Sequence, residues 1–286
     1  MNNKSVRTQF AKQFSFFMAI PAFVWVFICF YIPLLTIIAR SLLTRSPGEI
    51  IPHFTPDYYA QLFELKYFHV IWRSLLLAFG TSVSCLLIGY PVAYFLARKA
   101  RSAKNILLFF LMLPFAVNLL VQAYAWFFVL GKSGLINQAL MMLGLISDPL
   151  NILNTPVAVY IGMIYCYVPF MIMPLYAVLE KLDQRFVEAS FDLGADWFKT
   201  MWRVVLPLSM PGIVTGFFLV FIPVFGEFVI PNLLGGNKQM FVGSLISFYF
   251  LITRNLAVGS AFTCLSGIIV LTAAVFTYWR LKKLWA

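Results

Sequence analysis

Few side chains in this 286-residue sequence have the chemistry of a functional site, and the most unusual of them is Glu227. It lies in an apolar run from Leu208 to Leu233 in which no other residue is charged. An ionisable side chain inside a membrane is costly and commonly marks a substrate or ion pathway. We therefore expect Glu227 to face a translocation path and to attract a cation. The alternative is a carboxylate at the outer interface that is hydrated or paired with Arg73.

Aromatic and amide side chains in neighbouring apolar runs could complete such a cation site. An ammonium group binds to the face of an aromatic ring through a cation–π interaction. The candidates are Gln122, Tyr124 and Trp126 in one run, and Tyr165 and Tyr167 in the next. The alternative for each is packing, or a place in the aromatic belt at the membrane–water interface. Because 18% of the residues are aromatic, packing is the stronger alternative for any single one.

The sequence offers little basis for metal, nucleotide or nucleic-acid chemistry. The four cysteines lie singly in apolar runs without CxxC spacing, and His53 and His69 lack partnered carboxylates, so we expect no metal site. No GxxxxGK[ST] or HExxH stretch occurs, so we expect no enzyme and no bound cofactor. The formal net charge is +11, but the basic residues lie at the ends of apolar runs. That placement is typical of a membrane protein rather than of a nucleic-acid-binding protein.

The elements that must position these residues are apolar runs long enough to cross a membrane. The chain is 62% hydrophobic and only 11% charged, whereas soluble domains carry about 25% charged residues. About 20 apolar residues span the hydrocarbon core. We expect an all-α membrane protein forming a single domain, residues 1–286, with six transmembrane helices at 14–39, 74–97, 105–130, 156–179, 208–233 and 255–279. Two shorter uncharged stretches, 134–147 and 239–253, are expected to lie at the interface or to be re-entrant.

The distribution of Lys and Arg predicts the orientation. With six spans, both termini lie on one side, and that side receives 14 of the 21 basic residues. Basic residues collect on the cytoplasmic side. We therefore expect cytoplasmic N- and C-termini, and the polar segment between the fourth and fifth spans falls on the same side.

That polar segment, residues 181–207, is the longest in the second half of the chain, and we call it the coupling segment. A stripe of Leu182, Phe186, Ala189 and Leu193 predicts an amphipathic helix. Gly194 interrupts it, and Asp196 can cap a second short helix. From the pattern alone, docking to a partner and lying on lipid headgroups both remain open. Farther along, Gly212 and Gly216 form a GxxxG motif for close helix approach, either within the chain or at a subunit interface.

The coupling segment resembles the cytoplasmic signature of binding-protein-dependent ABC importer permeases. That signature reads Glu-Ala-Ala, three residues, Gly, nine residues, Ile, one residue and Leu-Pro. It is matched here by Glu188, Ala189, Ser190, Gly194, Val204, Leu206 and Pro207. Ser for Ala and Val for Ile are the departures. The resemblance implies the six-helix type I permease fold, with Glu188 and Ala189 on a helix that docks onto an ATPase, Gly194 at a bend, and Leu206-Pro207 at the return to the membrane.

Two further stretches are similar to polyamine permeases: 168–176 with 180–183, and 223–236. The resemblance implies a bacterial inner-membrane subunit that forms half of a pathway for spermidine or putrescine. Its implied partners are cytoplasmic ATPase subunits that use ATP, a second permease chain, an extracytoplasmic substrate-binding protein and membrane lipid. The alternatives are an ABC permease for another small solute, an ion-coupled secondary transporter or channel, and a membrane-embedded enzyme. We further expect the helix that follows the coupling segment to run as one element through Glu227, near its outer end, with an irregular stretch there because of Pro223, Gly226 and Pro231.

Overall fold

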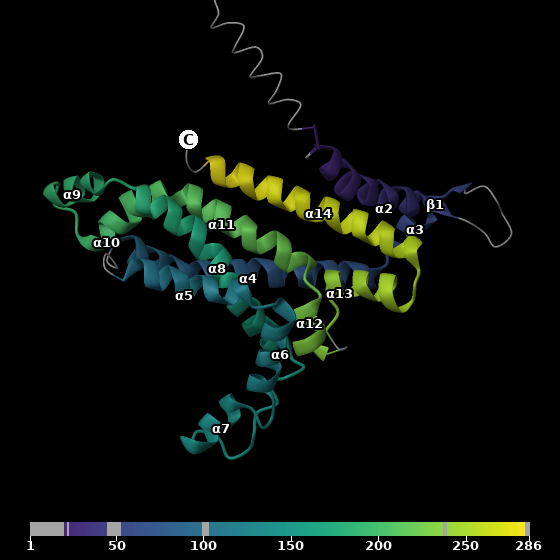
Figure 1. Ribbon diagram of the computed structural model, residues 1–286, viewed down its shortest axis with the longest axis horizontal. Coiled ribbons are helices and arrows are strands. Elements are labelled where there is room, and N and C mark those ends of the chain that lie inside the picture. The colour runs from purple at the N-terminus through teal and green to yellow at the C-terminus, as the bar shows by residue number, and fades with distance from the viewer. Residues whose placement is uncertain (1–19, 22, 45–52, 99–102, 237–238, 284–286) are drawn as a thin grey trace, which may run out of the picture. The chain divides into compact units, whose positions relative to one another are not determined.

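The computed structural model describes residues 20–21, 23–44, 53–98, 103–236 and 239–283, and its regular structure is almost entirely helical (Figure 1). This confirms the all-α class. Three parts of the expected elements lie outside the described residues. They are the start of the first expected span, the basic residues at 99 and 101, and residues 237–238, which come just before the stretch 239–253. The chain forms two compact units, Met1–Glu64 with Tyr249–Leu265, and Leu65–Phe248 with Ser266–Ala286.

The first unit contains one membrane-length helix and a small hairpin. The π-helix η1 (Phe27–Tyr31) runs into α2 (Ile32–Leu42), and β1 (Leu43–Thr44) pairs antiparallel with β2 (His53–Phe54) before α3 (Asp57–Leu62). The Tyr59 hydroxyl hydrogen-bonds with Ser41 Oγ at 2.9 Å, which ties α3 to α2. The π-helix η4 (Phe248–Ile252) and the first part of α14 (Leu256–Lys283) complete this unit.

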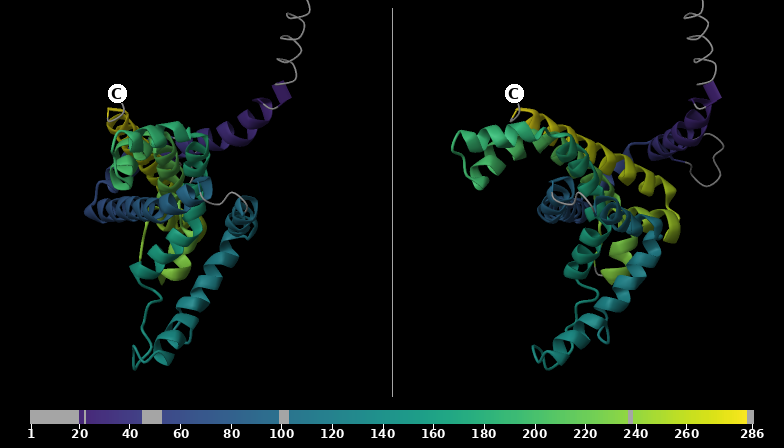
Figure 2. Two further views of the ribbon diagram at one scale, coloured as in Figure 1. Left: turned by 90° about the vertical axis from the view of Figure 1, so that its left-hand side faces the viewer. Right: turned by 60° about the vertical axis from the view of Figure 1, so that its left-hand side comes forward.

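Three long helices, α4 (Leu65–Arg98), α8 (Pro156–Lys181) and α11 (Leu206–Gly226), form the centre of the second unit (Figures 1 and 2). The helices approach closely because small residues lie between them. A Cβ added to Gly212 would lie 2.9 Å from the carbonyl oxygen of Pro174, and one added to Gly216 would lie 2.7 Å from Met171 Sδ. The GxxxG motif therefore serves a contact within the chain, between α11 and α8.

Two of the six expected spans are interrupted, so their prediction as continuous helices was wrong. The expected helix 105–130 is divided into α5 (Lys104–Ala116) and α6 (Leu119–Leu130), and the expected helix 208–233 into α11 and α12 (Val229–Leu234). Pro114 and Pro223 lie just before these breaks and lack the N–H that helix continuation uses. At each break a polar side chain accepts N–H groups of the following helix: Asn118 from Leu120 N (2.8 Å), and Glu227 from Val229 N (2.8 Å).

The remaining elements are short. They are α7 (Leu135–Met142) and α13 (Val242–Ser247) in the two stretches expected to be too short to span, and α9 (Gln184–Asp192), α10 (Trp197–Thr200) and the π-helix η2 (Met201–Val205) in the coupling segment. Six helical stretches among the described residues are long and apolar enough to cross a membrane, as expected. The third, however, is Leu119–Met142 rather than 105–130, and the second begins at Leu65 rather than at 74.

Candidate functional site

Glu227 lies in the break between α11 and α12 and is held by three donors. The Tyr167 hydroxyl on α8 donates to Oε2 at 2.8 Å. The backbone N–H groups of Phe228 and Val229 donate to Oε1 at 3.0 and 2.8 Å. The structure describes Arg73 as well and shows no ion pair between it and Glu227, so the alternative of an Arg73 partner was wrong. The carboxylate is partly exposed, and its orientation is fixed because both of its oxygens accept hydrogen bonds.

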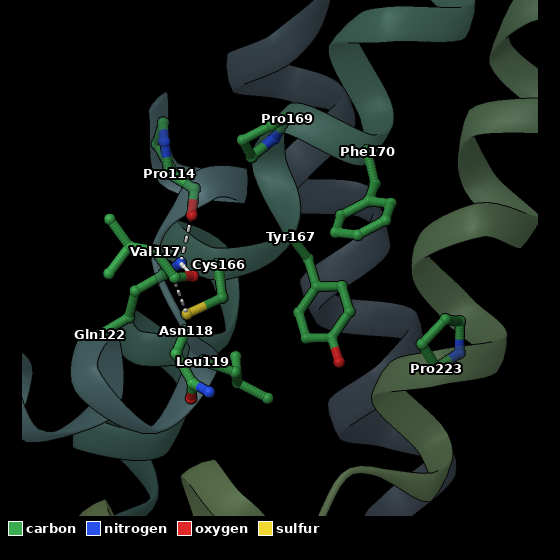
Figure 3. A pocket seen from close by; sticks show the side chains of 10 residues that line it. All are labelled: Pro114, Val117, Asn118, Leu119, Gln122, Cys166, Tyr167, Pro169, Phe170 and Pro223. Atoms are coloured by element: carbon green, nitrogen blue, oxygen red, sulfur yellow. Dashed lines mark hydrogen bonds between the residues drawn. The ribbon is translucent and has the colours of Figure 1, made fainter. Parts of the chain in front are cut away.

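A cavity of about 390 Å³ is lined by Tyr167, the residue that holds this carboxylate; Glu227 itself does not line it (Figure 3). Tyr167 forms part of its wall, together with Pro223 from the turn of α11 before the break. Pro114 and Asn118 line the opposite wall from the α5–α6 break. The α5–α6 break therefore lines the cavity, and α11 contributes to it one turn before its own break. Irregular backbone within a membrane protein is tolerated where it lines a cavity.

Gln122 closes the α5–α6 break rather than presenting a free amide to the cavity. Its Nε2 donates to the carbonyl oxygens of Pro114 and Val117, and its Oε1 accepts from the thiol of Cys166 at 3.4 Å (Figure 3). These contacts compensate carbonyl groups that the end of α5 leaves without helical partners. Gln122 is therefore a positioning residue at this cavity.

The other aromatic candidates lie apart from Glu227. Trp126 and Tyr165 pack edge to face with ring centroids 5.3 Å apart and line a neighbouring cavity of about 300 Å³. Tyr124 lines neither cavity and is 50% exposed. The structure thus brings together Gln122, Tyr167 and Glu227 from the expected set. Sequence reasoning missed Asn118 and assigned Cys166 to simple core packing. Pro114 lies four residues before Asn118, but a proline alone does not predict a break.

The coupling segment is a helix, a bend and a second helix, as expected. Asp183 caps α9 by accepting from Arg185 N at 3.0 Å, and Asp196 caps α10 by accepting from Lys199 N at 2.9 Å. Gly194 between them has φ +79°, a conformation that glycine adopts without steric cost. The apolar face of α9 is open to solvent, with Phe186 57% and Leu193 89% exposed. Glu188 and Ala189 lie on the exposed surface of the same helix.

Ser190, a departure from the family pattern, has a structural partner that the sequence did not reveal. Its Oγ lies 2.8 Å from Thr200 Oγ1 and donates to the carbonyl oxygen of Val187 at 2.7 Å. Ser190 is 9% exposed and Thr200 2% exposed. This buried hydroxyl pair ties α9 to α10 across the Gly194 bend.

The coupling segment joins α11 without a loop. The π-helix η2 ends at Val205 and α11 begins at Leu206, followed by Pro207. Pro207 cannot donate to the carbonyl oxygen of Arg203, which removes one α-helical hydrogen bond at this point. The helical path then continues to Gly226, the residue before Glu227. The expectation of one helical element through Glu227 is corrected: the helix ends immediately before it.

An ion pair joins α5 to α8 at the end of the bundle nearest the coupling segment. The Lys104 ammonium pairs with Glu180, and this hydrogen bond raises the pKa of Lys104. Lys104 Nζ also lies 5.4 Å from the ring centroid of Tyr176. Both charged groups are exposed to solvent, so the pair contributes little to stability.

These features define a multi-pass helical membrane protein with an exposed coupling segment at one end and a carboxylate held by a residue that lines an intramembrane cavity. Residues 89–282 match the family described as binding-protein-dependent transport system inner membrane component, and the chain belongs to this family. It is therefore a multi-pass inner-membrane component of a transport system rather than an enzyme in itself.

Similar proteins carry transport names. The spermidine/putrescine transport system permease protein PotB of Haemophilus influenzae is 42% identical over 264 residues, covering 92% of each chain. PotB of Escherichia coli K12 is 40% identical over 261 residues, covering 91% of this chain and 94% of its own. The inner membrane ABC transporter permease protein YdcU of Escherichia coli K12 is 30% identical over 272 residues, covering 89% and 86%.

The fold matches solved transporter structures. A bacterial ABC transporter that imports the acidic polysaccharide alginate contains a chain that superposes with a TM-score of 0.75 at 16% identity, covering 98% of this chain and 99% of its own. The alginate transporter in complex with its alginate pentasaccharide-bound periplasmic protein gives a TM-score of 0.76 at 15% identity, covering 98% and 97%. At this identity the likeness establishes the ABC importer permease fold.

Proposed function

We propose that this chain is the permease subunit that carries a polyamine, spermidine or putrescine, through an ABC importer. The observation that carries the proposal is the Glu227 carboxylate, which is oriented by the hydroxyl of Tyr167, a residue that lines the cavity. Relatives that are 40–42% identical over more than nine-tenths of the chain are named as spermidine/putrescine permeases, which supports the same substrate class.

The site has acceptor capacity left for an ammonium group. A carboxylate offers about four lone-pair sites, and the structure shows three donors to Glu227, namely one hydroxyl and two backbone N–H groups. Tyr167 and Phe170 lie with ring centroids 5.7 Å apart, and both line the cavity. Their faces suit the cation–π contacts that a chain of ammonium and methylene groups can make.

The proposed partners follow from the coupling segment and from the size of the chain. The exposed face of α9 would dock onto a cytoplasmic ATPase that uses ATP, and both termini of the chain would then lie in the cytoplasm. A second permease chain would supply the other half of the pathway, and a substrate-binding protein would deliver the polyamine from outside. Motion of α9 would reach Glu227 through η2 and α11, which are continuous up to Gly226.

Uptake in reconstituted vesicles tests the function. The chain would be reconstituted with the proposed partners, namely the ATPase, the second permease and the binding protein. Uptake of labelled spermidine would then be measured in the presence of excess unlabelled putrescine, molybdate or maltose. We expect ATP-dependent uptake that putrescine reduces and the other solutes do not. If the complete transporter takes up neither labelled spermidine nor labelled putrescine, the chain is a permease for another solute. Polyamine uptake that persists without ATP and follows an ion gradient would support a secondary transporter.

A further inference from the structure

A third cavity, of about 550 Å³, lies near the start of α4 and shares no lining residue with the cavity at Tyr167. Its walls are apolar, with Leu76 and Leu77 on α4, Val157 on α8 and Phe241 before α13. Arg73, Gln239 and Tyr160 add polar groups to its lining, and the Tyr160 hydroxyl is already bonded to the carbonyl oxygen of Gly80. Among the described residues that line this cavity, none carries a carboxylate that could neutralise the Arg73 guanidinium.

The position of Arg73 along α4 places it at the level of lipid headgroups. Arg73 lies 25 residues before Arg98 at the other end of α4, and 25 residues at 1.5 Å each correspond to about 38 Å. The hydrocarbon core is about 30 Å thick, and the bilayer with its headgroups about 40–45 Å. If Arg98 lies in one headgroup layer, as its place beside the coupling segment implies, Arg73 lies in the opposite one.

We propose that this cavity binds one anionic phospholipid, from the leaflet opposite the coupling segment. The guanidinium of Arg73 matches a phosphate in charge and can donate two parallel hydrogen bonds to it. The apolar walls accommodate the upper part of an acyl chain. The cavity is continuous with the lipid-facing surface, since Leu76 is 54% and Val157 58% exposed. A polyamine is excluded from this site by the charge of Arg73.

A lipid in this position would support the segment that packs against Glu227. Ser74, the residue after Arg73, accepts from Val242 N at 2.8 Å and so holds the start of α13. The next residue, Gly243, packs so closely that an added Cβ would lie 2.5 Å from the carbonyl oxygen of Glu227. The start of α13 thus connects Ser74, beside Arg73, with the backbone of Glu227. The lipid proposal does not depend on the identity of the transported solute.

Native mass spectrometry of the purified chain tests the proposal. The protein would be exchanged into detergent with phosphatidylglycerol or with zwitterionic phosphatidylcholine, and bound lipids counted. Two variants probe the site: Arg73→Gln removes the charge, and Leu77→Trp fills the cavity while keeping Arg73. Lys132→Gln, which removes an exposed cation outside the cavity, is the matched control. Thermal unfolding with added phosphatidylglycerol gives a second readout, since a ligand that binds the folded state raises Tm.

We expect the wild-type chain and Lys132→Gln to retain one phosphatidylglycerol in preference to phosphatidylcholine. Arg73→Gln should bind it about ten-fold more weakly, because a hydrogen bond to a charged group is lost, and should lose the rise in Tm. Leu77→Trp should also lose the bound lipid. Equal retention of the two lipids by wild type, or unchanged phosphatidylglycerol binding in Arg73→Gln, would overturn the proposal. Displacement of the lipid by millimolar inorganic phosphate would likewise overturn it, by assigning the site to free phosphate.

Discussion

The bend at Gly194 allows a substitution whose cost arises from the backbone alone. With φ +79° and no atom within 4 Å of an added Cβ, Gly194→Ala creates no clash but places alanine in the left-handed region. That conformation costs roughly 1–2 kcal/mol for a residue with a Cβ. Such a cost corresponds to a decrease of about five- to thirty-fold in the population of the native bend. Asparagine tolerates this region better than alanine, so Gly194→Asn should cost less.

The assay is ATP-driven polyamine uptake by the reconstituted transporter. We expect Gly194→Ala to slow uptake by up to about thirty-fold and Gly194→Asn to retain most of it. Gly144→Ala is the matched control, because Gly144 has φ +67° and also has nothing within 4 Å of its Cβ, but follows α7. Full uptake by Gly194→Ala, or an equal loss in Gly144→Ala, would refute the view that this bend transmits motion from α9.

Two further substitutions test the packing around this pathway. Thr200→Val removes one hydroxyl of the buried pair with Ser190, so we expect a loss of about 0.5–1.5 kcal/mol in stability and faster amide exchange in α9. If the loss arises from the hydroxyl pair, Thr200→Val should lower stability less in a Ser190→Ala background than in the wild type. Additive effects of the two substitutions on thermal unfolding would contradict a stabilising Ser190–Thr200 pair. Gly216→Val should lower Tm because its side chain meets Met171 on α8, at a cost of about 1–3 kcal/mol. Gly267→Ala is the control and should not lower Tm, because there is open space at its Cβ. Equal effects of the two substitutions on Tm would contradict the close packing of α11 on α8.

Much of the architecture was readable from the sequence, for physical reasons. Runs of apolar residues identify membrane helices because the bilayer has a fixed thickness, and six such helices are present. The coupling segment was readable because the spacing of Glu188, Gly194 and Pro207 is local along the chain. The caps by Asp183 and Asp196 form over two or three residues and are equally local.

Pro223, Gly226 and Pro231 indicated an irregular helix around Glu227. That a helix ends at either break was not readable, because prolines also occur inside the intact helices. Pro169 and Pro174 lie within α8, which continues through both, whereas α5 and α11 end shortly after Pro114 and Pro223. What distinguishes them is tertiary: Gln122 and Tyr167 reach across to groups at the breaks from other turns or helices. The Ser190–Thr200 pair was missed for the same reason, since it forms only once α9 and α10 fold together.

Neutralising Glu227 tests the central claim most directly. Labelled spermidine uptake would be measured over a range of concentrations for wild type, Glu227→Gln and Asp148→Asn, the last an exposed acid in the loop after α7. Glutamine keeps the shape but lacks the charge. If its amide oxygen accepts from the backbone N–H groups of Phe228 and Val229, the Tyr167 hydroxyl can accept from its NH2 group. We expect KM for spermidine to rise about ten-fold or more in Glu227→Gln, because a hydrogen bond to a charged group is worth about 1.5 kcal/mol or more, and to stay unchanged in Asp148→Asn. An unchanged KM in Glu227→Gln would contradict a polyamine pathway past this carboxylate.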